Sequence, residues 1–363
     1  MCCPLLIPAV GAQPFSPEEG ESPAPDTLGA AVYFEGRLHY GFIIIHSRDI
    51  RAIEDSYPWG FEVDFGKYAA SQAVWDRCNC NLRRGWSLGF WDFDNRQVLG
   101  AGVTGQYFIE PEFRVSKKLR FSVRGAMGLS YQNRPHDPVT NPENLSYSTR
   151  IAFPLTVGIT ARKKLNPHWQ VHLSGRYNHI SNGSIRQPNK GINWPTLAAG
   201  LSYSPHPIAD TPREKKPWRS LGPPQRRTDI TAFGSFDKTR NRVLTGIGGA
   251  EVKYSAQVAR LSALTIATEW GVHGSYPLRE GGERSFSGQL LGGIAAGHEF
   301  LLGKFIFSQQ LGVYLHKPPN EPRDVYQRYG LVYRATEHWG TGIGFKAHGH
   351  VADFIDLRIT RFL

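Results

Sequence analysis

Apolar and polar residues alternate with a period of two along most of the chain. In one segment the odd positions are apolar or small and the even positions are mainly polar: Leu119, Phe121, Val123, Met127, Leu129 and Tyr131 against Lys118, Arg120, Ser122 and Arg124. The same alternation recurs in residues 305–315 and 325–334. Because successive side chains of a β-strand point to opposite faces, this pattern predicts strands with one apolar and one polar face.

Strand-like segments fill the rest of the sequence as well. The further candidates are 37–47, 59–68, 84–93, 97–114, 146–163, 167–181, 193–205, 228–237, 244–258, 261–276, 283–299, 338–349 and 351–362. Several exceed ten residues, which suits tilted membrane-spanning strands better than those of soluble sheets. We therefore predict an all-β fold, an antiparallel transmembrane outer-membrane β-barrel of about 14–16 strands.

Aromatic residues near the strand ends support a membrane setting. Tryptophans recur there (Trp59, Trp86, Trp91, Trp169, Trp194, Trp270 and Trp339), as the aromatic girdles of membrane barrels require. The last strand ends with Phe362, next to the final residue, similar to the terminal strand of outer-membrane barrels. The alternative is a soluble β-sandwich or a secreted lipocalin-like barrel, in which the apolar face covers a core.

Two segments interrupt the strand pattern. Residues 1–30 are predicted to be a leader: an apolar start that resembles a truncated signal peptide without a positive region, then a Pro- and Glu-rich flexible stretch. Residues 206–227 are rich in Pro, Lys and Arg, and predict a long loop. We predict a single barrel over 31–363, because each half would otherwise have to close independently; two smaller barrels are the alternative.

Composition narrows the class of partner. The mean hydropathy is −0.37, and no run of 18 apolar residues occurs, so a helical membrane span is excluded. The net charge of +11 requires an anionic partner or surface. Nucleic acid is disfavoured because the basic residues are spread over many strands, whereas a phosphorylated glycolipid fits. Cysteine spacing gives no metal site, and no cofactor is predicted.

Candidate chemistry concentrates in residues 167–195. In the predicted strand, His179 and Ser181 share the apolar face with Tyr177, two residues apart and at the strand end. An ionisable residue on such a face costs free energy unless it has a partner or a function. The Gly- and Asn-rich bend that follows offers backbone amides for an oxyanion. A base, a nucleophile and nearby donors are the requirements of ester hydrolysis.

The string His179-Ile-Ser181-Asn182-Gly183, followed by Pro188-Asn189 and Gly191-Ile192, resembles the outer-membrane lipid A 3-O-deacylase family, the acyloxyacyl hydrolase-like barrels. The resemblance covers about residues 167–205. It implies an active site on the outside wall, Ser181 as nucleophile and His179 as general base. It also implies an oxyanion hole from Asn189 and the backbone amides of Gly183 and Ser184.

One position departs from the family. Its third triad residue is a Glu fourteen residues after the His, and this sequence has Asn193 there. An Asn can orient an imidazole but cannot stabilise the imidazolium by charge. Asp353 and Glu110 are alternative sources of the missing carboxylate.

These observations predict a lipid A deacylase of the bacterial outer membrane, a carboxylic ester hydrolase acting on lipopolysaccharide. Trp169 and Tyr177 are expected to contact the acyl chain, and Arg186 and Lys190 the glucosamine phosphates. The alternative is a non-catalytic structural or porin-like barrel with a degenerate site. A soluble lipid-binding barrel is a third hypothesis.

Overall fold

The computed structural model describes residues 31–183, 185–208, 214–238, 244–274, 288–319, 321–349 and 351–363 of the chain. The predicted leader, residues 1–30, lies outside the described residues.

The first eight strands close into a barrel. They are β1 (Ala31–Gly41), β2 (Trp59–Ala69), β3 (Asn81–Asp92), β4 (Ala101–Arg114), β5 (Leu119–Gln132), β6 (Ile151–Lys164), β7 (Trp169–Ser181) and β8 (Ile192–Tyr203). Each strand pairs antiparallel with its neighbour in sequence, and β8 returns to pair with β1 from Phe34↔Tyr203 to Gly41↔Thr196. β1 begins six residues before the start of the predicted strand 37–47, and it ends six residues before that strand's predicted end.

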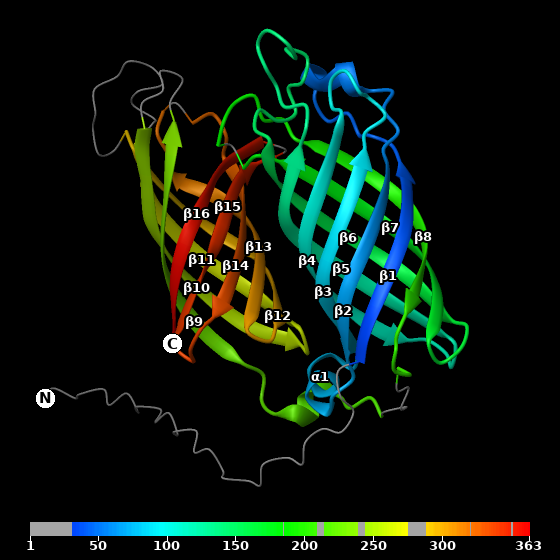
Figure 1. Cartoon of the computed structure of the whole chain (residues 1–363). Helices are drawn as coiled ribbons and strands as arrows, with labels where there is room; N and C mark the ends of the chain where they lie inside the picture. The colour runs from blue at the N-terminus through cyan, green and yellow to red at the C-terminus, as the bar shows by residue number, and fades with distance from the viewer. Residues whose placement is uncertain are drawn as a thin grey trace, which may run out of the picture.

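The last eight strands close into a second barrel. They are β9 (Arg226–Lys238), β10 (Leu244–Ala259), β11 (Ser262–His273), β12 (Leu290–Leu302), β13 (Phe305–His316), β14 (Val325–Arg334), β15 (Trp339–His348) and β16 (Val351–Phe362). Here β16 pairs with β9, from Leu357↔Gly234 to Phe362↔Asp229. The two barrels lie side by side in Figure 1, with the segment between β8 and β9 running past the end that carries α1 (Gln72–Cys78).

The all-β antiparallel class is therefore confirmed, and the described strands number sixteen. The prediction of a single barrel over 31–363 is wrong. Period-two alternation is the same in a strand of either barrel, so it does not reveal which strands close together. The Pro- and Lys-rich segment 206–227 marks the boundary, and contains the short 3₁₀ helix Trp218–Leu221.

Apolar side chains cover the outside of both barrels, and polar ones fill the inside. In β5, the outward residues Phe121, Val123 and Leu129 are exposed, whereas Arg120 and Arg124 at alternate positions are buried. This inside-out distribution is the one expected for barrels surrounded by lipid. No helix in the described part of the chain is long and apolar enough to cross a membrane.

Charged side chains fill the lumen of the first barrel. Arg37 forms ion pairs with Glu35, Glu62 and Asp64, and every one of these side chains is almost fully buried. Arg124 adds a second contact to Asp64, with Nη1 2.5 Å from Oδ2. An eight-stranded barrel is just wide enough for such side chains to fill. The packed lumen argues against the porin-like alternative.

The second lumen is built in the same way. Arg328 joins Glu269 and Asp356, each with an N–O separation of 2.5 Å, and Lys346 lies 3.2 Å from Glu269. Buried charges require partners of this kind, because an unpaired ion in such surroundings is costly. Both barrels are therefore held from within by ion pairs, while their apolar faces point outward.

An apolar cluster closes one end of the first barrel and supports its loops. It includes Trp91, Phe93, Ile180, Ile192 and Trp194, all at most 3% exposed. The short 3₁₀ helix η1 (Arg48–Ile53) packs onto it through Ile50 and Ile53. Ile180 and Ile192 come from β7 and β8, so the cluster fixes the ends of these two strands.

Candidate active site

The predicted catalytic residues lie at the end of β7 and the start of β8. Ile180 points into the apolar cluster, so its neighbours His179 and Ser181 point to the outer face of the barrel, as the strand alternation predicted. His179 is paired with Asn193 in the β7–β8 register. Directly opposite residues of antiparallel strands have Cβ atoms about 4.5–5.5 Å apart, so their side chains meet.

A hydrogen bond joins the two residues. His179 Nδ1 lies 2.7 Å from Asn193 Oδ1. Because an amide oxygen only accepts, Nδ1 carries the proton and donates, which leaves the lone pair on Nε2. This is the tautomer that a general base requires when it takes a proton through Nε2.

Asn193 has a second partner that the sequence did not reveal. Its Nδ2 lies 3.1 Å from Nδ1 of His46, and His46 Nε2 lies 2.9 Å from the backbone oxygen of Lys190. His46 follows β1, and the Ile44 amide donates to the Asn193 carbonyl at 2.8 Å. The chain beyond β1 therefore continues to pair with β8 and carries His46 to the site. His46 is 133 positions from His179, and it belongs to no motif.

The bend between β7 and β8 is held by asparagines. The Asn182 amide donates to Asn189 Oδ1 at 2.8 Å, and Asn182 Nδ2 donates to the Arg186 carbonyl at 2.7 Å. Gly183 has φ 64°, a left-handed conformation that favours glycine. Asn189 thus uses its oxygen to close the bend and keeps its Nδ2 group for another acceptor. Ser184, predicted for the oxyanion hole, lies outside the described residues.

Two neighbouring loops brace this bend. Lys190 and Gly191 donate their backbone N–H groups to the carbonyls of Leu145 and Ser146, at 3.0 and 2.8 Å. Lys190 Nζ also lies 2.8 Å from Asp49 Oδ2, and this hydrogen-bonded ion pair lowers the pKa of the Asp49 carboxyl. Lys190, predicted to contact phosphate, is therefore already paired, whereas the Arg186 side chain is exposed.

Gly191 lies directly against the imidazole of His179. Its φ is 70°, and a Cβ atom at this position would lie 2.8 Å from His179 Cε1. Only glycine combines this backbone conformation with this close approach. The glycine of the sequence motif therefore makes room for the ring.

Ser181 lies half-buried beside His179 on the outer face. Within the described ranges, no hydrogen bond joins its hydroxyl to the imidazole. Such contacts often tighten only when substrate binds. A Cβ atom built on Gly183 would lie 3.2 Å from Ile355 of β16, and 3.3 and 3.4 Å from two ring atoms of Phe153 of β6. The second barrel therefore approaches the first beside the site.

Trp169 is not part of this site. It begins β7, twelve residues before Ser181, and a strand rises about 3.3 Å per residue, so the two lie roughly 40 Å apart along the strand. With a tilt near 45° this spans almost the whole ~30 Å hydrocarbon core, so Trp169 lies at the opposite membrane interface. The predicted contact of Trp169 with the acyl chain is wrong. Tyr177, four residues before Ser181, is exposed on the outer face and is close enough.

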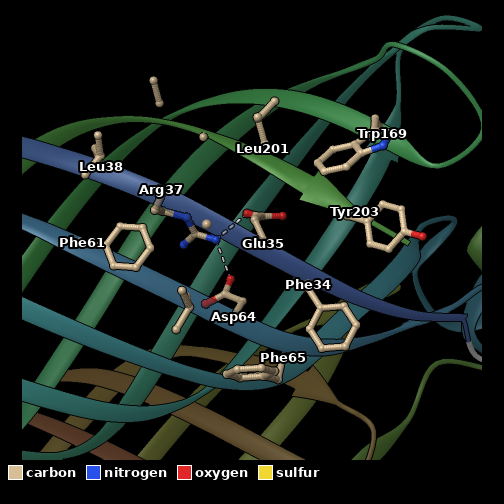
Figure 2. Close-up of a pocket in the computed structure, with 14 residues that line it drawn as sticks. Phe34, Glu35, Arg37, Leu38, Phe61, Asp64, Phe65, Trp169, Leu201 and Tyr203 are labelled. Atoms are coloured by element: carbon tan, nitrogen blue, oxygen red, sulfur yellow. Dashed lines mark hydrogen bonds and ion pairs between the residues drawn. The ribbon is translucent and has the colours of Figure 1, made fainter. Parts of the chain in front are cut away.

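Trp169 instead borders a hollow in the outer wall, about 480 Å³ in volume. Figure 2 shows its aromatic rim, and behind it Arg37 paired with Glu35 and Asp64 in the lumen. Gly36 and Gly200 are among the residues that line it. The hollow lies on β1, β2 and β8 at the end far from Ser181.

Neither alternative carboxylate reaches His179. Glu110 is fully buried in the lumen, where Arg162 lies 2.6 Å away. Asp353 is in the second barrel, with an oxygen 3.9 Å from His348 Nδ1. Glu110 points into the lumen, and the imidazole nitrogen that a third triad residue would hold is hydrogen-bonded to Asn193 and not to Asp353. Asn193 holds the third position.

The second barrel repeats the scaffold of the first, but other residues stand at the positions of His179 and Ser181. β7 and β15 both begin with a tryptophan that follows a histidine. In the turn before each strand, the tryptophan carbonyl accepts two N–H groups: from Leu165 and Asn166 in the first barrel, and from Ala335 and Thr336 in the second. On this alignment His179 corresponds to Gly349 and Ser181 to Val351. Among the described residues, no three or more His, Cys, Asp or Glu are grouped to hold a metal.

Comparison with known families agrees with this division. Residues 60–202 match the family model of lipid A 3-O-deacylase (PagL), and residues 226–362 match that of the acyloxyacyl hydrolase C-terminal domain. The first barrel is thus similar to lipid A 3-O-deacylase, and the second to the acyloxyacyl hydrolase C-terminal domain. The boundary between the two matches falls where the first barrel ends and the second begins. The PagL match, together with the two apolar-walled barrels, indicates a location in the bacterial outer membrane.

Solved structures of similar barrels share little sequence with this chain. The outer-membrane enzyme PagL is 15% identical, with 46% of this chain and 97% of that chain covered and a TM-score of 0.34. Neisserial surface protein A is 11% identical, with coverages of 48% and 98% and a TM-score of 0.34. A Rh. blastica porin variant is 10% identical, with coverages of 92% and 100% and a TM-score of 0.20. No curated protein matches the sequence.

Proposed function

We propose that this chain removes an acyl chain from lipid A, with Ser181 as nucleophile and His179 as general base on the lipid-facing wall of the first barrel. The observation that carries the proposal is the 2.7 Å hydrogen bond from His179 Nδ1 to Asn193 Oδ1, which leaves Nε2 free beside Ser181. The site lies at the strand end, where a lipid ester meets its headgroup.

In the proposed reaction, Ser181 Oγ attacks the ester carbonyl carbon while His179 Nε2 takes the hydroxyl proton. The carbonyl oxygen becomes an oxyanion, which the Gly183 amide and Asn189 Nδ2 would stabilise. Removing one such donor typically costs about 10²–10³ in kcat. The intermediate then expels the glucosamine hydroxyl, which receives the proton from His179. Water, activated by the same base, releases the fatty acid from the acyl-Ser181 ester.

The surroundings fit the two parts of this substrate. Tyr177 and Leu155 are exposed on the outer face next to the site and offer an apolar surface to the acyl chain. Arg186 is exposed on the bend above them, where a phosphate of the headgroup would lie. Arginine binds phosphate through two parallel hydrogen bonds.

The test is mass spectrometry of lipid A incubated with the purified protein. We expect wild type to release a fatty acid, and Ser181→Ala and His179→Ala to lose this activity while remaining folded. Ser220→Ala is the control, since Ser220 is exposed in the segment between the barrels. Full activity in either site variant would exclude the mechanism. A wild type that leaves lipid A intact would exclude the function.

A further inference from the structure

The Lys190 carbonyl, His46, Asn193 and His179 form a hydrogen-bonded network on the outer wall of the first barrel. The backbone carbonyl determines which groups of this network donate and which accept. The Lys190 oxygen can only accept, and it lies 2.9 Å from His46 Nε2. The proton of neutral His46 is therefore on Nε2, and Nδ1 carries the lone pair. Nδ1 lies 3.1 Å from Asn193 Nδ2, so the amide donates to it.

The contact with His46 then determines how the Asn193 amide is oriented. Once Nδ2 of Asn193 faces His46, Oδ1 faces His179 at 2.7 Å and accepts from Nδ1–H. The reverse arrangement would place the lone pair of His46 Nε2 against the lone pairs of the Lys190 carbonyl. His46 Nδ1–H would then donate to the turned amide oxygen, so the loss would fall on the contact between His46 Nε2 and the Lys190 carbonyl. The observed direction pairs both nitrogens of His46, both ends of the Asn193 amide and Nδ1 of His179.

This direction matters because an isolated asparagine is ambiguous. Its amide can present either oxygen or nitrogen to a histidine. In a Ser-His-Asp triad, replacing Asp by Asn lowers kcat about 10⁴-fold because the histidine takes the wrong tautomer. A partner that can only accept on the far side of the amide removes this ambiguity.

We infer that His46 is a positioning residue that holds Asn193 in the orientation a catalytic carboxylate would supply, and so sets the tautomer of His179. His46 does not touch the substrate; it acts through Asn193. The inference rests on the proposed function for its catalytic meaning, but the tautomers themselves exist in the resting protein.

The supporting geometry is built from separate elements. His46 comes from the segment after β1, Lys190 from the bend before β8, and Asn193 from β8. The Ile44–Asn193 backbone hydrogen bond of 2.8 Å holds the first against the third. The Lys190–Asp49 ion pair of 2.8 Å holds the bend against the same segment that carries His46.

The direct test is ¹⁵N NMR of histidine-labelled full-length protein in detergent micelles at pH 8. His46→Gln and His179→Gln variants assign the two rings. We expect His46 protonated on Nε2 alone and His179 on Nδ1 alone. A His46 proton on Nδ1, on both nitrogens, or a His179 proton on Nε2 would overturn the inference. This measurement needs no turnover, so it separates failure of the inference from failure of the proposed function.

A kinetic test uses Asn193→Glu, which restores the family's carboxylate. A carboxylate accepts from His179 whichever way it turns, so His46 should become dispensable. We expect His46→Phe to lower kcat at least tenfold with Asn193 present, with little change in KM. With Glu at position 193 the same change should cost less than threefold. His168→Phe, at the opposite end of β7, is the control.

Equal losses in both backgrounds would show that His46 only supports the loop, and would overturn the inference. An unchanged kcat in His46→Phe would overturn it as well.

Discussion

Gly191→Ala tests whether the imidazole of His179, the proposed general base, is held as tightly as the structure indicates. The added Cβ would lie 2.8 Å from His179 Cε1 and 3.1 Å from the Ile180 carbonyl oxygen. Ordinary contact begins near 3.4 Å, so the ring has to retreat by about half an ångström, or the bend has to open. Opening the bend would move the adjacent Lys190 carbonyl away from His46.

The expected effects on stability and on rate differ in size. A side chain in the left-handed region costs roughly 1–2 kcal/mol. A displacement of about 1 Å in a catalytic group can cost about 10²-fold in rate. We therefore expect Gly191→Ala to remain folded, and to release fatty acid from lipid A about ten- to a hundredfold more slowly.

The assay compares fatty-acid release and urea unfolding in the same detergent. Gly175→Ala is the matched control. Gly175 lies on the outer face of β7, the strand that carries His179, and a Cβ atom there would meet nothing within 4 Å. If Gly191→Ala kept full activity while folded, the imidazole would not be confined as argued. If Gly175→Ala lost as much activity, the effect would belong to the strand and not to the bend.

Two further predictions concern the barrels. Arg37→Met should destabilise the first barrel by on the order of 3–5 kcal/mol, because it leaves three buried carboxylates without their shared partner; an unfolding midpoint as high as that of the exposed-site variant Arg186→Met would contradict this. Residues 31–208 alone should fold, because β8 pairs with β1 and needs no strand from the second half; heat-modifiable electrophoretic mobility checks this, and a permanently unfolded fragment would refute it.

The composition of the candidate site could be predicted from the sequence only in part. Strand alternation placed His179 and Ser181 on the outer face, because a period of two leaves no other choice once Ile180 is buried. The motif supplied Asn189, Gly183 and the unusual Asn193. The length of β7 argues against the predicted contact of Trp169 with the acyl chain, because the twelve residues from Trp169 to Ser181 span nearly the whole membrane.

Barrel closure and His46 were decided by tertiary structure alone. Sixteen strands with the same alternation are compatible with one barrel or two, because alternation reports which face is apolar and not which strand meets the first. His46 reaches Asn193 only because β1 and β8 are neighbours in the closed barrel. A contact between residues 147 positions apart leaves no periodic signal, so the direction of the network is visible only in space.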